Sequence, residues 1–120
     1  MKTIVLSSQR SVENEIQILI NLFELGLKSF HLRKPYYSKQ KMRKYLDNIP
    51  SLYHNRIIIH SHHKLAKKYN LKGIHLSSKD RKSNFKNWIN IKSLKRKKPF
   101  LRVSTSFNTT SELNEYIDLY

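Results

Sequence analysis

In this 120-residue chain, five short apolar runs are each followed by polar side chains that can bind a charged group or transfer a proton. Arginine can grip a phosphate group through its planar fork of N–H donors, and histidine can donate or accept a hydrogen bond. A carboxylate suits a hard cation such as Mg2+. Together these residue types favour a site for a small anion. The side chains concerned are Ser7, Ser8, His31, Arg33, His60, Ser61, His75, Ser77, Asp80, Ser104 and Ser106.

The apolar runs themselves are typical of β-strands, because they are short and either alternate in polarity or are rich in β-branched residues. The run RIIIH is almost continuously apolar, a pattern that suits a strand buried on both faces of a parallel sheet. The predicted strands are Thr3–Ser7, Ser29–Arg33, Arg56–His60, Gly73–Leu76 and Phe100–Thr105.

The segments between these runs are predicted to be helices. In Glu13–Leu25 the apolar residues recur at helical spacing, with Ser11 as a candidate cap before the helix and Gly26 as a stop after it. Lys39–Ile49 follows Ser38, a second capping residue. Shorter helices are expected over His62–Tyr69, Ser83–Leu94 and from about Thr110 to Asp118.

Strands that alternate with helices predict parallel βαβ units, so the fold class is α/β. Two architectures remain open, an open doubly wound sheet and part of an eight-stranded (β/α)8 barrel. A barrel needs about 200 residues or more, so composition and length alone favour the open sheet. In both architectures ligands bind at the carboxyl ends of the strands. We therefore expect the polar side chains that end the runs to line one edge of the sheet.

Composition excludes several classes of protein. The chain has no cysteine, which rules out a disulfide scaffold, cysteine-ligated zinc and a cysteine nucleophile. No apolar run approaches the roughly 20 residues of a membrane helix, and the first ten residues lack the apolar region of a secretory signal. We expect a single soluble domain over residues 1–120, in the cytoplasm and without a membrane partner.

The net charge of +16, from 24 Lys and Arg against 8 Asp and Glu, leaves two interpretations open. The basic run Lys92–Lys98 could contact the phosphates of a nucleic acid. Alternatively, the lysines only solvate the surface, around a small-anion site. The chain has no RNA-module signature, no zinc finger and no basic arm joined to heptads, so the sequence favours the solvated surface and disfavours a nucleic-acid partner.

Histidines invite a separate question. The stretch His60-Ser61-His62-His63 places three imidazoles within four residues, a spacing that can hold a metal ion. However, His60 ends a strand whereas His62 and His63 begin a helix, so their side chains should diverge. We therefore interpret them as cap and surface residues. His75 either faces the ligand or is a satisfied core histidine.

Three segments resemble the thiamine phosphate synthase family, which includes the related thiazole tautomerases. They are ELGLKSFHLRK, RIIIHSHHKLAKKYNLKGIHLSSKD and LRVSTSFNTTSEL, and the resemblance covers nearly the whole chain. Gly73-Ile74-His75-Leu76 followed by Asp80 is the most specific part. The resemblance implies a (β/α)8 barrel that joins a pyrimidine diphosphate to a thiazole phosphate, with release of pyrophosphate and with Mg2+ as the cofactor.

The resemblance assigns roles to individual residues. Arg33 matches the arginine that contacts the diphosphate, Ser104 matches a family serine, and Asp80 matches one of the carboxylates that bind Mg2+. His31 stands where the family has glutamine, and His60 stands where it has asparagine. The resemblance therefore implies substrate binding by His31, Arg33, His60 and Ser104 and metal binding by Asp80, with no catalytic residue assigned.

Two departures put activity in question. Ser61 replaces a second Mg2+-binding aspartate, and Pro35 replaces a lysine. With about five βα units, the chain is expected to be the truncated N-terminal part of an unclosed barrel, inactive alone and able to self-associate through open sheet edges. The alternatives are a non-catalytic barrel relative that binds a phosphorylated ligand or a regulatory partner, and a basic nucleic-acid-binding protein.

Overall fold

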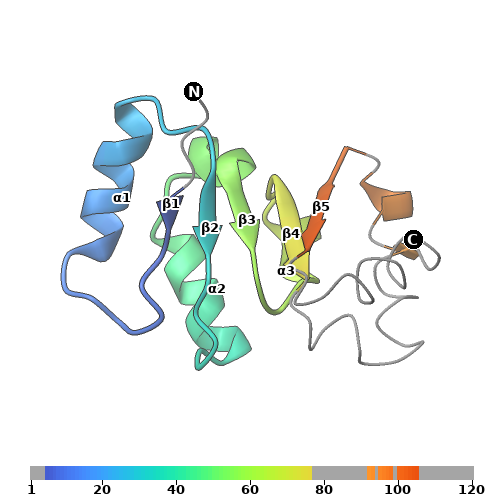
Figure 1. Cartoon of the computed structure of the whole chain (residues 1–120), viewed down its shortest axis with the longest axis horizontal. Coiled ribbons are helices and arrows are strands. Elements are labelled where there is room, and N and C mark those ends of the chain that lie inside the picture. Colours follow the sequence, from blue (N-terminus) through green and yellow to red (C-terminus); the bar gives the residue numbers. More distant parts are fainter. Residues whose placement is uncertain (1–4, 77–91, 94, 99, 106–120) are drawn as a thin grey trace, which may run out of the picture.

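The computed structural model describes residues 5–76, 92–93, 95–98 and 100–105. Its centre is a five-stranded parallel sheet in which each strand pairs with the next one along the chain, in the order β1-β2-β3-β4-β5 (Figure 1). An order without reversal is that of a barrel, whereas a doubly wound sheet reverses its order midway. The predicted α/β class and the open part of a (β/α)8-type barrel are therefore confirmed. The strands are Val5–Leu6 (β1), Phe30–Leu32 (β2), Ile57–Ile59 (β3), Gly73–Leu76 (β4) and Arg102–Thr105 (β5).

The helices connect these strands. They are α1 (Glu15–Glu24), α2 (Lys39–Asp47) and α3 (Leu65–Lys68). A 3-10 helix, η1 (Ser51–Arg56), which was not predicted from the sequence, lies between α2 and β3. The predicted cap at Ser38 is confirmed, because its hydroxyl accepts a hydrogen bond of 3.1 Å from the amide of Lys41. The stop at Gly26 is also confirmed, since this residue has a φ of 102°.

The cap predicted at Ser11 is wrong. Helix α1 begins after Asn14, which has a φ of 63° and makes no capping hydrogen bond with its side chain. The Ser11 hydroxyl instead lies 2.8 Å from the hydroxyl of Tyr37. Helix α3 is shorter than the predicted His62–Tyr69, because His62 has a φ of 49° and cannot belong to a regular helical turn.

The core lies between one face of the sheet and the helices. Alternation along the strands places every second side chain on this face, and Leu32, Ile59 and Ile74 are fully buried there. Ile58 lies on the opposite face and is buried too, with 7% exposure. Strand β3 is therefore buried on both faces, as its apolar run predicts. The helices contribute Leu19, Phe23, Met42, Leu46, Leu65 and Ala66 to the same core.

A buried ion pair fixes the end of β2 to the start of α1. The side chain of Lys34 is completely buried, and its Nζ atom donates to Glu15 Oε1 at 2.8 Å and to the carbonyl oxygen of Arg10 at 2.7 Å. Lys34 therefore points to the face opposite that of its neighbour Arg33, as expected from strand alternation.

Gly73 allows β4 and β5 to approach closely. A Cβ atom at this position would lie 2.3 Å from the carbonyl oxygen of Arg102, its partner in register. We expect Gly73→Ala to lower the free energy of unfolding by about 1–3 kcal/mol, because the strands must separate. Urea denaturation measures this loss, and hydrogen exchange should show weakened protection of the β5 amides. Gly26→Asn is the control, since asparagine tolerates a positive φ. A Gly73→Ala protein with unchanged stability would contradict this packing.

The predicted elements near the C-terminal end fall largely outside the described residues. This applies to the helix over Thr110–Asp118 and to all of Ser83–Leu94 except residues 92–93. In the basic run, residues 92–93 and 95–97 are helical and exposed, so the lysines among them are solvated as predicted. Across the described ranges, no helix has the length and apolar character needed to cross a membrane.

Candidate functional site

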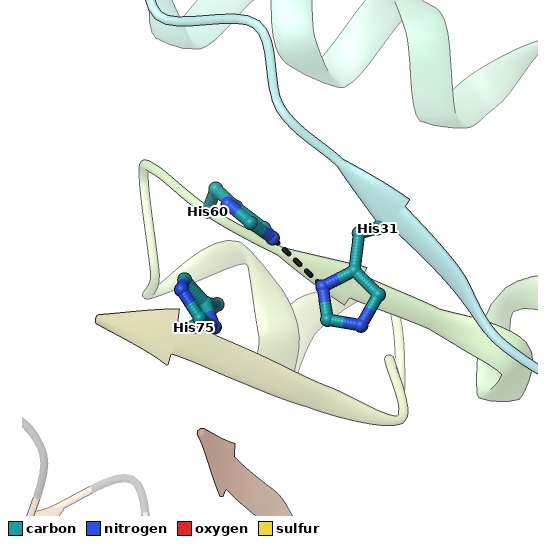
Figure 2. A group of neighbouring side chains, drawn as sticks. All are labelled: His31, His60 and His75. Atoms are coloured by element: carbon teal, nitrogen blue, oxygen red, sulfur yellow. Dashed lines mark hydrogen bonds between the residues drawn. The ribbon is translucent and has the colours of Figure 1, made fainter. Parts of the chain in front are cut away.

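Three half-buried histidines from adjacent strands gather on the face of the sheet opposite the core (Figure 2). His31 Nδ1 lies 2.8 Å from His60 Nε2, and the rings of His60 and His75 stack with their centroids 4.2 Å apart. His75 Nδ1 in turn lies 2.8 Å from the hydroxyl oxygen of Ser104. We call these four residues the histidine row. It links four successive segments of the sheet, from β2 to β5.

Strand alternation explains why the row faces away from the core. His31 lies between the buried Phe30 and Leu32, so its own side chain must project from the other face. His75 occupies the equivalent position in β4 and is in register with Ser104 in β5. His60 directly follows β3, where its amide donates to the carbonyl of Leu32 at 3.1 Å and extends the ladder by one residue.

The environment disfavours the charged forms of His31 and His60. Burial is the largest cause that lowers the pKa of His60 to about 3, and the neighbouring His75, His31, Arg33 and His63 contribute to the same shift. Burial, followed by the charge of Lys72, also lowers the pKa of His31. A neutral imidazole carries one N–H donor and one lone pair, so His31 and His60 can each hydrogen bond to a ligand or donate an electron pair.

Arg33 lies beside the row at the carboxyl end of β2, and its side chain is exposed. Two hydrogen bonds fix its backbone to β1: the Arg33 amide donates to Ser7 Oγ at 2.8 Å, and the Ser7 hydroxyl donates to the Arg33 carbonyl at 3.1 Å. Its charge acts on His60, which places the guanidinium within electrostatic reach of the row. The exposed Pro35 contributes no charge here.

The structure brings together three of the predicted site residues, His31, His60 and Ser104, and places Arg33 beside them. Asp80 lies outside the described residues. For His75 two interpretations were open, a residue that faces the ligand and a core histidine. It is half-buried on the face opposite the core, where it joins His60 to Ser104.

The other two histidines of the HSHH stretch are not part of the row, as predicted, but all three histidines are half-buried, so their interpretation as surface residues is wrong. His62 Nε2 bonds to the carbonyl of Tyr37 at 2.9 Å, and His63 Nε2 bonds to the carbonyl of His75 at 2.9 Å. Both ring nitrogens thereby support the backbone around the site.

A hollow of about 620 Å3 lies along this face beside the row. It is large enough for a small phosphorylated molecule, since ligand pockets commonly measure about 300–1,000 Å3. Its lining includes His31, Ile58, Lys72, His75, Arg102 and Ser104.

The residues described here do not fit Mg2+. Among them, one set of three potential metal ligands comes close together, and it consists of His31, His60 and His75 with no carboxylate. Mg2+ prefers oxygen ligands and binds imidazole poorly. The magnesium site implied at Asp80 therefore stays a prediction.

Comparison with known proteins shows the family. A crystal structure of thiamine phosphate pyrophosphorylase from Bacteroides thetaiotaomicron is similar, with 30% sequence identity and a TM-score of 0.62. The match covers 98% of this chain and 66% of that enzyme, so the chain spans about two thirds of its length. No family model matches the chain, and no curated protein matches it. The identity, the strand order and the nearly complete coverage together show that the chain belongs to the thiamine phosphate synthase-like family.

Proposed function

We propose that this chain binds the pyrimidine diphosphate substrate of thiamine phosphate formation at the carboxyl edge of its sheet, with Arg33 on the diphosphate. In the complete reaction that the family resemblance implies, the pyrimidine is joined to a thiazole phosphate and pyrophosphate leaves. The observation that carries this proposal is the exposed Arg33 beside the histidine row, where its charge acts on His60.

The geometry around Arg33 supports anion binding. Its backbone is fixed by two hydrogen bonds to Ser7, so little backbone ordering remains to be done when a ligand binds. No acidic side chain among the described residues forms an ion pair with Arg33, and the residue is exposed. Arginine binds phosphate oxygens bidentately, and a neutral imidazole N–H can donate one further bond.

We propose further that the chain binds this substrate without turning it over. The family resemblance places a Mg2+-binding carboxylate at position 61, where this chain has a serine whose Oγ is buried and makes no hydrogen bond within the described residues. Such a hydroxyl carries no charge with which to hold a divalent cation against a diphosphate. This observation favours the non-catalytic, phosphate-binding alternative. For a nucleic-acid partner, the described part of the basic run Lys92–Lys98 offers mainly exposed basic side chains.

The proposed contact predicts a selective loss of binding. Arg33→Ala should weaken the affinity for the pyrimidine diphosphate about 10- to 100-fold, because a hydrogen bond to a charged group contributes about 1.5–3 kcal/mol. Isothermal titration calorimetry at fixed ionic strength measures the change. Arg43→Ala is the matched control, since Arg43 lies in α2 on the helical side of the sheet and its removal changes the net charge equally. Equal losses in the two variants would show that only net charge attracts the ligand.

A further inference from the structure

We propose that His31, His60 and His75 form a binding site for a divalent transition-metal ion of the Zn2+ type, distinct from the Mg2+ that the family resemblance implies. The proposal does not depend on the phosphate-binding role of Arg33. It rests on where three strands place their imidazole nitrogens (Figure 2).

The distances allow shared coordination. One ligand nitrogen from each ring lies within 4.8 Å of the others, and the pair His31 Nδ1 and His60 Nε2 is only 2.8 Å apart. Two nitrogens on a tetrahedral Zn2+ are separated by about 3.3 Å, given Zn–N bonds of about 2.0–2.1 Å. Small rotations about the side-chain bonds are therefore enough to bring the three nitrogens to tetrahedral spacing. The nitrogens of His31 and His60 would move apart, and the ring of His75 would move toward them.

The donor chemistry selects the class of metal. Neutral imidazole is a good ligand for Zn2+, Ni2+ and Cu2+, whereas Mg2+ and Ca2+ prefer oxygen. The proton in the His31–His60 hydrogen bond moves to the outer nitrogen of its ring by tautomerisation, so both facing nitrogens can bind the ion without a net change of charge. Three histidines leave a fourth position for water or a ligand oxygen.

The surroundings orient the third ligand. His75 Nδ1 lies 2.8 Å from Ser104 Oγ; in the tautomer in which the Nδ1–H group donates to this oxygen, the lone pair of the ring is on Nε2. The His63 ring bonds to the His75 carbonyl at 2.9 Å and holds the backbone of β4 at the same point. Outer partners of this kind are typical of built metal sites.

The test is direct metal binding by the untagged chain after treatment with a chelator. Calorimetry with Zn2+ alone should give one ion per chain, and Co2+ should give the intense visible absorption of a tetrahedral complex, whereas Mg2+ should give no comparable heat. His31→Gln and His60→Asn, which introduce the residues implied for the family, should each lower the Zn2+ affinity by more than about 100-fold, beyond the loss typical of an outer partner. Ser104→Ala should lower it about tenfold.

His62→Ala is the matched control, because it removes an imidazole from the same stretch of chain while leaving the three proposed ligands. Circular dichroism checks that each variant folds. Should His60→Asn not fold, imidazole nitrogen resonances of the wild-type protein supply the answer, since those of His31, His60 and His75 should shift on addition of Zn2+ while that of His54 does not.

The outcomes are separable. Zn2+ binding that survives His31→Gln and His60→Asn, that is lost equally in His62→Ala, or that is absent from the wild type would overturn the site. Because the titration contains no phosphate, none of these results bears on Arg33. Conversely, loss of diphosphate binding in Arg33→Ala with Zn2+ binding intact would leave the metal site standing.

Discussion

Glu15→Ala should lower the free energy of unfolding by about 3 kcal/mol, the low end of the range for breaking a buried ion pair. Lys34 is completely buried, and without Glu15 its ammonium would keep the carbonyl of Arg10, at 2.7 Å, and the rings of Tyr37 and Tyr45, none of which carries a negative charge. The side chain of Glu15 keeps 15% exposure, so water can partly replace it, which explains the choice of the lower value. Urea denaturation with an unchanged m-value measures the loss.

Two further variants separate the buried charge from simple loss of a side chain. Glu13→Ala removes an exposed acid from the same segment and should change stability by about 0.5 kcal/mol or less. The double variant Glu15→Ala, Lys34→Met should recover much of the loss, because an apolar side chain needs no counter-ion. If the double variant is as unstable as Glu15→Ala alone, the cost does not arise from an unpaired lysine.

The second large effect concerns turnover. A mixture of this chain with pyrimidine diphosphate, thiazole phosphate and Mg2+ should yield no detectable thiamine phosphate. Loss of preorganised charge at one position typically costs roughly 10²–10³ in rate, and the family resemblance implies that two such groups are replaced, at Pro35 and Ser61. Product analysis by chromatography measures the outcome. Clear turnover that Arg33→Ala abolishes would show that these two replacements are tolerated and that the chain is an enzyme.

The sheet was predictable from the sequence because its signals are local. Each strand lies inside an apolar run bounded by polar residues, and the repetition of strand and helix is sufficient to predict parallel pairing. The Ser38 cap was predictable for the same reason, since the hydroxyl and the amide of Lys41 are three residues apart. In contrast, Ser11 is also a serine just before a predicted helix, but it contacts Tyr37, 26 residues away, and does not cap α1.

The position of the site was predictable from the sequence, but the hydrogen bonds between its side chains were not. Strand alternation placed His31, His60 and Ser104 at one edge of the sheet. The contacts between His31 and His60 and between His75 and Ser104 each span 29 residues, so they depend on register between strands that no local pattern specifies. Burial of Lys34 against Glu15 is a similar case. The sequence indicates that Lys34 faces away from Arg33, whereas only the packing of α1 on β2 supplies its partner.

The central claim is that a phosphate-bearing ligand binds at the carboxyl edge of the sheet, and mapping inorganic pyrophosphate onto the backbone amides by NMR tests it most directly. The amino ends of β4 and β5 provide a rival, a hollow of about 510 Å3 with Lys72, Lys97 and Lys98 in its lining. We predict that the largest shifts fall on Arg33, His60 and Ser61 and disappear in Arg33→Ala. Shifts centred on Lys97 and Lys98 that persist in Arg33→Ala would contradict the account and place the anion at the opposite end of the sheet.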